Sequence, residues 1–192
     1  MIEIHRIFVG LQGDFWRGRA DLRFFQIETA ISAAGYDSLG MKPTTDPISR
    51  EQMIELLNED LAREYQAIIA YVIYSQTLKG PEYTAIAKEL EVHAAEELSH
   101  AILIAKQVDY FNGTPAHIPK EVKISDDPKE MLRFDLENER DTIRNYRDRI
   151  RQAEAMGEFA LSETLRNIIL QEQDHLQDLA DALGIDTPKI ED

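Results

Sequence analysis

The sequence contains no cysteine. This absence excludes disulfide bonds, a thiolate zinc site, an iron–sulfur cluster and a thiol nucleophile. Long hydrophobic runs are also missing, because the longest one, at residues 68–74, falls far short of the roughly 20 residues that a membrane-spanning helix needs. The N-terminus lacks the basic-then-apolar pattern of a signal peptide. We therefore expect a cytoplasmic protein with no membrane partner.

Positive charge is scarce as well. The chain has 21 lysines and arginines against 36 aspartates and glutamates, which gives a formal net charge of −15. A chain this acidic repels nucleic acid unless a local basic patch attracts it. Residues 1–23, with four arginines and three acidic side chains, amount to only +1. Nucleic acid is thus not an expected partner, whereas an acidic surface suits either the attraction of metal cations or solubility alone.

The first part of the chain differs from the rest. Residues 1–50 are expected to form an N-terminal arm and linker, with a short strand near residues 7–9, a helix over 21–34 and a linker over 40–47. No function follows from this arm. Residues 51–192 are expected to form one domain.

Four long segments of this domain have hydrophobic residues at helical spacing. The segments cover residues 49–78, 81–111, 126–156 and 158–183. The first begins with Ser49 and Gln52 in a capping-box pattern. The links within the first and second pairs of helices are short, whereas about 15 residues with three prolines separate the pairs. This order predicts an all-α four-helix bundle of two antiparallel hairpins joined by one long crossover.

Each predicted helix has a glutamate near the middle of its apolar stripe, and two add a histidine three residues later. These six residues are Glu64, Glu97, His100, Glu139, Glu172 and His175. A buried, unpaired carboxylate is very costly, and the stripes contain no lysine or arginine to pair with it. Two divalent cations would balance the four glutamates, whereas the alternative is that the buried polar groups satisfy one another or bind water.

The spacing of these residues indicates a dimetal site. One glutamate from each of two helices and a Glu-x-x-His from each of the other two is a di-iron pattern of helix bundles. Moreover, 33 residues separate Glu64 from Glu97, and again Glu139 from Glu172. Carboxylates and imidazoles suit iron, with manganese or zinc as possible replacements.

At these residues the chain resembles the bacterioferritins and other ferritin-like di-iron carboxylate proteins. The similarity extends over about residues 53–183 and lies in the segments 57–68, 97–101, 131–139 and 172–175. The resemblance implies a ferritin-like four-helix bundle that binds two iron ions per chain. The implied ligands are the terminal Glu64 and Glu139, the bridging Glu97 and Glu172, and His100 and His175, one on each iron. Tyr71 falls where the family has a tyrosine beside the site, as an outer-sphere donor or a one-electron source.

Two departures from the family pattern bear on haem and assembly. Bacterioferritins bind haem between subunits through a methionine directly after the bridging glutamate of the second helix, and Leu98 stands there instead. We therefore expect no haem. The segment after His175 is too short for a full fifth helix. We therefore expect a homo-oligomer, which is either a cage of 12 or 24 subunits or a smaller assembly.

The resemblance implies a ferroxidase that oxidises Fe(II) with O2 or H2O2 for iron storage or detoxification. One alternative is a di-iron oxidase or oxygenase for an organic substrate, which would need a pocket beside the metals, lined by small residues such as Ser75 or Thr142. Another is a Dps-type DNA-protecting protein, against which the acidic balance and the lack of a lysine-rich tail argue.

Several other polar residues are open to more than one interpretation. His93, one turn before a bridging glutamate, is an extra ligand, a group beside the ligands or a core histidine. Asp135 lies either beside the ligands or on the surface. Glu96 and Gln171 either orient the opposite histidines or are solvated. The charged run at residues 144–151 is expected to form a solvated helix face with ion pairs.

Overall fold

The protein is described by a computed structural model over residues 48–191, so the strand, helix and linker predicted for the N-terminal arm lie outside the described residues. The described part contains four α-helices, one short 3-10 helix and no strand, which confirms the all-α prediction. The elements are α2 (Arg50–Thr77), η1 (Pro81–Tyr83), α3 (Thr84–Tyr110), α4 (Pro128–Ala155) and α5 (Phe159–Leu183). None of the helices within residues 48–191 is long and apolar enough to cross a membrane.

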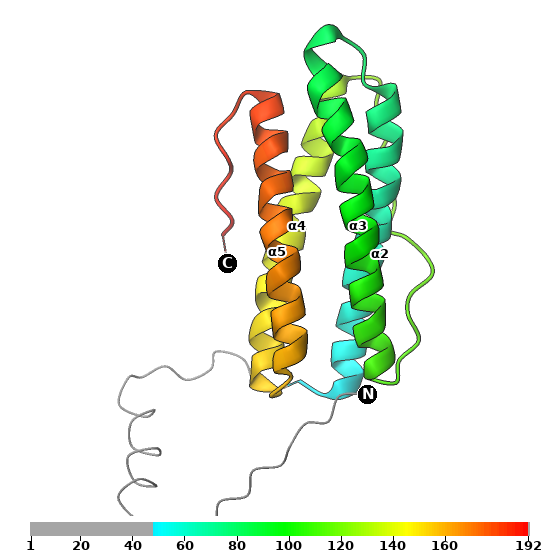
Figure 1. Ribbon diagram of the computed structural model, residues 1–192, viewed down its shortest axis with the longest axis vertical. Coiled ribbons are helices and arrows are strands. Elements are labelled where there is room, and N and C mark those ends of the chain that lie inside the picture. The colour runs from blue at the N-terminus through cyan, green and yellow to red at the C-terminus, as the bar shows by residue number, and fades with distance from the viewer. Residues whose placement is uncertain (1–47, 192) are drawn as a thin grey trace, which may run out of the picture. The chain divides into compact units, whose positions relative to one another are not determined.

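The helices form a four-helix bundle of two hairpins (Figure 1). Helices α2 and α3 make one antiparallel pair and α4 and α5 the other, and the pairs meet where α2 packs on α4 and α3 packs on α5. The predicted crossover joins α3 to α4 and runs along α2. There the backbone N–H of Lys120 donates to the carbonyl of Ala62 at 3.0 Å, and Asn58 bonds the backbone of Thr114 and Ala116.

The helix ends follow from local side-chain chemistry. The Ser49 side chain accepts a bond from the backbone N–H of Gln52 at 3.2 Å, and the Gln52 side chain accepts one from the backbone N–H of Ser49 at 2.8 Å. The predicted capping box is therefore confirmed. The second helix begins later than predicted, since Pro81 opens a 3-10 turn that precedes α3. At the end of α5, Gly184 has a φ of 68°, the left-handed conformation that glycine adopts readily.

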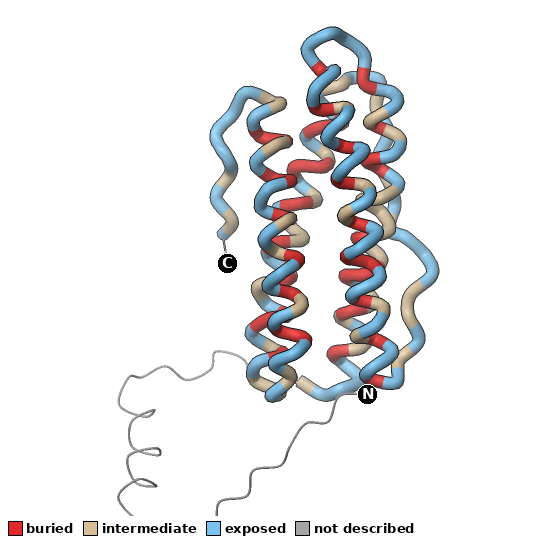
Figure 2. The backbone as a smooth tube through the Cα atoms, viewed as in Figure 1, coloured by how far each residue is buried: buried red, intermediate tan, exposed pale blue. Residues whose placement is uncertain are grey.

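The core consists of two apolar clusters with a polar layer between them. One cluster includes Tyr71, Leu90, Leu132 and Leu176, and the other contains Leu57, Ile104, Tyr146 and Leu165. The buried residues follow the inward faces of all four helices (Figure 2). The buried polar residues of the layer are Asp60, Glu64, His93, Glu97, His100, Asp135, Glu139, Glu172 and His175. The two clusters cover this layer from both ends of the bundle.

The prediction of a solvated face at residues 144–151 is wrong at Arg149. The residue is only 7% exposed, and its Nε donates to Oδ2 of Asp60 at 2.8 Å. The reason lies on the neighbouring helix, because Asp60 is itself buried and needs a cation nearby. In contrast, Arg144 and Arg151 are partly exposed and pair with aspartates on their own helix, as predicted.

The buried pair between Asp60 and Arg149 should contribute strongly to stability. Arg149→Met leaves the Asp60 carboxylate buried without its cation, and we expect a loss of about 3 kcal/mol in the free energy of unfolding. Urea unfolding of the metal-free protein at fixed protein concentration would measure this loss. As a control, Arg151→Met removes a partly exposed pair and should cost at most about 1 kcal/mol. Equal stability of the two variants would contradict a structural role for the buried pair.

Candidate metal centre

All six residues predicted as metal ligands meet in the polar layer. Helices α2 and α4 each contribute one glutamate, and α3 and α5 each contribute a glutamate and a histidine one turn apart. None of the six is more than 2% exposed. The pairs on α3 and α5 point inward together because residues three positions apart share one helix face.

The six side chains form two overlapping groups that could each hold a metal ion. One group is Glu64, Glu97, His100 and Glu172, and the other is Glu97, Glu139, Glu172 and His175. Within each group, one ligand atom from every residue lies within 4.8 Å of the others. The two groups share two carboxylates, Glu97 and Glu172. Such sharing is what two metal ions bridged by two carboxylates require.

The distances within the groups suit a coordination shell. Nδ1 of His100 lies 3.2 Å from Oε1 of Glu172, 3.4 Å from Oε2 of Glu97 and 3.5 Å from Oε2 of Glu64. Nδ1 of His175 lies 3.0 Å from Oε1 of Glu97 and 3.4 Å from Oε2 of Glu172. Ligand atoms at about 2.1 Å from one metal ion are about 3.0–3.4 Å from each other. The chain therefore already holds its donor atoms at the separation that a metal would impose.

Several of these buried atoms have no hydrogen-bond partner. They are Oε2 of Glu64, Oε1 of Glu97, both carboxylate oxygens of Glu172 and Nδ1 of His175. A buried polar atom without a partner costs about 1–3 kcal/mol, more if it is charged, so natural proteins rarely leave them. A cluster of unpartnered atoms at one place fits a cation, which would satisfy all of them together.

Burial and mutual repulsion shape the charge of the cluster. Burial, together with the charges of Glu97 and Glu172, raises the pKa of Glu64 and of Glu139 well above the ordinary value. For the histidines burial acts to lower the pKa, but the neighbouring carboxylates outweigh it and raise the pKa of His175 to about 12, with the same direction for His100. Without a cation, protons on these four side chains therefore offset the negative charge.

The outer ring nitrogens of both histidines have partners of their own. Nε2 of His175 lies 2.9 Å from Oε2 of Glu96, and Nε2 of His100 lies 3.0 Å from Oε1 of Gln171. Nε2 of Gln171 donates to Oε1 of Glu96 at 2.9 Å, which links the two. These contacts confirm the prediction that Glu96 and Gln171 orient the opposite histidines. When a metal displaces the proton on Nδ1, the proton held on Nε2 leaves the lone pair of Nδ1 directed at the metal site.

Two tyrosines bond the outer glutamates. The hydroxyl of Tyr71, which the sequence placed beside the site, donates to Oε1 of Glu139. Tyr146 donates in the same way to Oε1 of Glu64, and the sequence analysis missed this role. A signal was present, because each tyrosine follows the glutamate of its own helix, Glu64 or Glu139, by seven residues. Seven residues are two helical turns, so both tyrosines lie on the inward stripe.

His93 and Asp135 are both buried at the edge of the layer, outside the two four-residue groups. The ring of His93 stacks on that of His175 with 4.0 Å between centroids, and burial, with His175 nearby, lowers the pKa of His93 to about 4. Burial, with the charge of Glu97 nearby, raises the pKa of Asp135 well above its usual range. The surface interpretation of Asp135 is therefore wrong.

Metal binding should release protons, because the raised pKa values of Glu64, Glu139, His100 and His175 favour protons on these side chains that a metal would displace. All four pKa values are raised, so the protons are bound below these values and binding tightens as pH rises. We expect about four protons released per chain when two Mn(II) ions bind. Titration in weak buffer with a pH indicator measures this. Glu64→Gln should lower the release to about three, and a release of one proton or fewer would refute this charge assignment.

Comparison with known proteins defines the class. The model of the ferritin-like domain family matches residues 54–186. The chain therefore belongs to the ferritin-like family, with the bundle and its polar layer inside the matched range.

The relatives and solved structures agree with this assignment. A bacterioferritin from Brucella melitensis biotype 1 is 25% identical over 70% of this chain and 84% of its own length. A ferritin-like, diiron-carboxylate protein from Bacillus anthracis str. Ames is 34% identical, with a TM-score of 0.68, and the match covers 71% of this chain and 99% of that one. A dodecameric thioferritin from Bacteroides fragilis is 25% identical, with a TM-score of 0.66, over 71% of this chain and 87% of that one.

Proposed function

We propose that this protein is a cytoplasmic iron-storage ferroxidase that binds two Fe(II) ions per chain and oxidises them with O2 or H2O2. The observation that carries the proposal is the pair of overlapping four-residue groups, buried between two apolar clusters and supplied entirely by one chain. Similarity to a bacterioferritin and to a diiron-carboxylate protein supports iron as the metal.

Each ligand has a distinct role in the proposal. Glu64 and Glu139 each hold one iron, His100 and His175 each complete one end, and Glu97 and Glu172 bridge the pair. Two bound Fe(II) ions would supply two electrons, one from each ion. These two electrons and two protons would reduce one H2O2 to two water molecules, or one O2 to H2O2. The four glutamates balance the charge of two divalent cations, so the site binds them without a further counter-ion.

The residues around the ligands fix their geometry and protonation. Tyr71 and Tyr146 hold one oxygen each of Glu139 and Glu64, which leaves the other oxygen free to bind. The apolar clusters above and below lower the local dielectric constant and strengthen the electrostatic contacts between the buried ligands. Oriented ligands lose less free energy on binding than mobile ones.

The size of the space beside the glutamates favours a ferroxidase over an oxygenase for organic substrates. Thr142, which was expected to line a substrate pocket, borders a cavity of only about 10 Å³, together with Glu64, Glu97, Glu139 and Glu172. This volume accommodates about one water molecule. O2, H2O2 or water would fit such a space with small side-chain movements, whereas an organic substrate would not. The larger pocket near His175 is lined by polar side chains, unlike the mostly apolar pockets that bind organic molecules.

Assembly into a homo-oligomeric cage is part of the proposal, supported by similarity to a dodecameric thioferritin. A bacterioferritin from Rhodobacter capsulatus, whose structure contains heme iron, has the same fold with 24% identity and a TM-score of 0.64, over 70% of this chain and 84% of that one. Here Leu98 follows the bridging glutamate, and its side chain cannot ligate iron. We therefore propose a cage without subunit-bridging haem, and no DNA-binding role.

Anaerobic Fe(II) titration followed by O2 tests the proposal. Wild-type protein should bind two irons per chain, oxidise them rapidly and take up more iron into a soluble core, as followed by ferric absorbance. Glu97→Ala removes a bridging carboxylate and should lower iron affinity by about tenfold or more. Two irons oxidised once without further uptake would favour a di-iron enzyme instead. If binding is not saturable, the dimetal assignment fails.

The two tyrosines should affect opposite ends of the centre. Tyr71→Phe frees Glu139 and should weaken metal binding at the His175 end by about tenfold, while Tyr146→Phe frees Glu64 and should do the same at the His100 end. Calorimetry with Mn(II) measures both sites. Tyr110→Phe is the control, because Tyr110 is exposed at the far end of α3. Unchanged affinities in both site variants would show that these hydrogen bonds do not support the ligands.

A further inference from the structure

A polar pocket opens beside the dimetal centre, between α3 and α5. Its volume is about 390 Å³, and it is lined by four carboxylates, two histidines and two glutamines, with no apolar side chain and no lysine or arginine. One of the lining residues is His175, so the pocket reaches the inner centre. Four carboxylates without a lysine or arginine leave the pocket strongly negative, which attracts cations.

Within this pocket, Glu89, His93 and Asp178 form a third group of ligand atoms. One donor atom of each lies within 4.8 Å of the others. Nε2 of His93 is 3.3 Å from Oδ2 of Asp178, which is within the range of about 3.0–3.4 Å for two ligands of one metal ion. His93 is only 2% exposed, and its Nδ1 has no hydrogen-bond partner. With one ring nitrogen beside a carboxylate and the other without a partner, the imidazole can coordinate a cation through either nitrogen.

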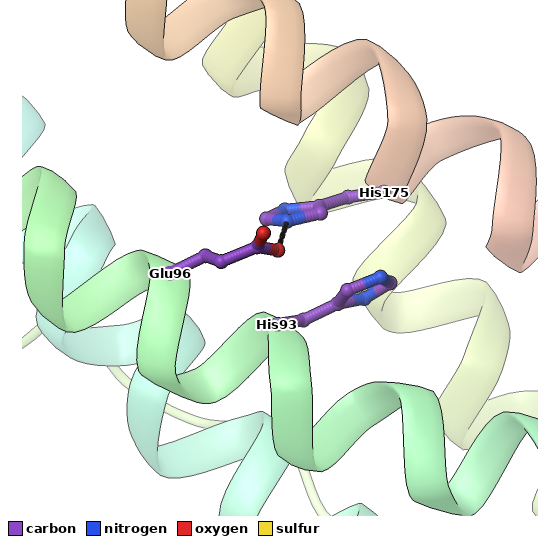
Figure 3. Close-up of side chains that lie close together, drawn as sticks. All are labelled: His93, Glu96 and His175. Atoms are coloured by element: carbon purple, nitrogen blue, oxygen red, sulfur yellow. Dashed lines mark hydrogen bonds and ion pairs between the residues drawn. The ribbon is translucent and has the colours of Figure 1, made fainter.

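A different triple, His93, Glu96 and His175, is also close enough to hold an ion. Figure 3 shows the carboxylate of Glu96 reaching His175 while the ring of His93 lies alongside. However, His175 directs Nδ1 at the inner glutamates, and its Nε2 bonds Glu96. A cation on Nε2 would break that bond and disturb the inner centre. A cation in the group that includes Asp178 would replace the contact between His93 and Asp178, but it would leave His175 and the inner centre unchanged.

The bundle itself does not require an imidazole at position 93. The two hairpins repeat each other with an offset of 75 residues, as in Glu97 and Glu172. By this offset the counterpart of His93 is Ile168, a buried apolar core residue. The counterpart of Asp178 is Leu103. His93 and Asp178 therefore have apolar counterparts in the other half of the bundle, so the repeat would permit apolar residues at both positions.

We propose that Glu89, His93 and Asp178 form a third cation site, specific for divalent metals such as Fe(II), Mn(II) or Zn(II). One imidazole and two carboxylates are ligands that these metals accept. The same pocket reaches His175, so a cation bound at this third site lies next to the dimetal centre. From this third site the cation passes into the dimetal centre. This transit role rests on the proposed function, whereas the site itself does not.

Zn(II) is the probe for the site, with Asp178→Asn as the variant and Asp174→Asn as the matched control. Asp174 lies one turn away on α5 and lines the same pocket, so both substitutions remove one charge from it. Anomalous diffraction of Zn(II)-soaked crystals should show three peaks per chain in wild type and in Asp174→Asn. In Asp178→Asn the peak at the third site, the outer peak, should vanish. Dialysis should show that the affinity of this site for Zn(II) is reduced by about tenfold or more.

Each of the other possible outcomes would overturn either the third site or the proposed function. Two inner peaks without an outer one would overturn this inference and leave the dimetal centre standing. An outer peak without inner ones would overturn the proposed function but not the site. Loss of the outer peak in both variants would mean that pocket charge alone attracts the ion. His93→Gln adds a check, because this variant should also lose the outer peak. Circular dichroism would verify that the variant is folded.

The transit role has its own measurement. In stopped-flow mixing with substoichiometric Fe(II) and O2, Asp178→Asn should oxidise iron about tenfold more slowly than wild type, with the same final extent. The slower rate at equal extent would show that the inner centre is intact but fills less readily. If Asp178→Asn reaches the wild-type rate, cations arrive by another route and the transit role is overturned.

Discussion

The cost of burying four carboxylates inside an apolar bundle is the constraint on which the rest of this structure depends. Glu64, Glu97, Glu139 and Glu172 lie close together with almost no access to water, and like charges repel strongly in such surroundings. Protons offset the repulsion in the metal-free chain, and two divalent cations would do so in the loaded one. These charges are held in one arrangement by the histidines, by the two tyrosines, and by the hydrogen bonds of Glu96 and Gln171.

The internal repeat explains how one chain builds both halves of the centre, and also where the halves differ. Glutamates, histidines and tyrosines recur with an offset of 75 residues, so each hairpin presents equivalent donors. The repeat fails outside the centre. Asp60 has Arg149 beside it, whereas its counterpart Asp135 has no ion pair within residues 48–191. His93 is present only near His175. The two ligand groups therefore have unequal surroundings, with the more polar one next to the open pocket.

Much of the fold and the site could be predicted because helices are local structures. An apolar stripe at helical spacing indicates both the helix and its inward face, so the glutamates that interrupt the stripes were identifiable as buried. The pairing of short and long links was enough to predict the hairpins and the crossover. Arg149 was misjudged because the reason for its burial, Asp60, is 89 residues away in the chain and on another helix. Tyr146 was visible on the stripe, but its partner was not.

The sequence by itself determined which residues are donors and how they are spaced along each helix, since backbone geometry places residues three or four apart on one face. Only the tertiary structure decided which carboxylates belong to both ligand groups, which nitrogen of each histidine faces inward, and that the space beside Thr142 is too small for an organic molecule. The pocket between α3 and α5 also belongs to the tertiary structure. These features depend on the rotation and stagger of packed helices, which arise from contacts between residues far apart in the chain.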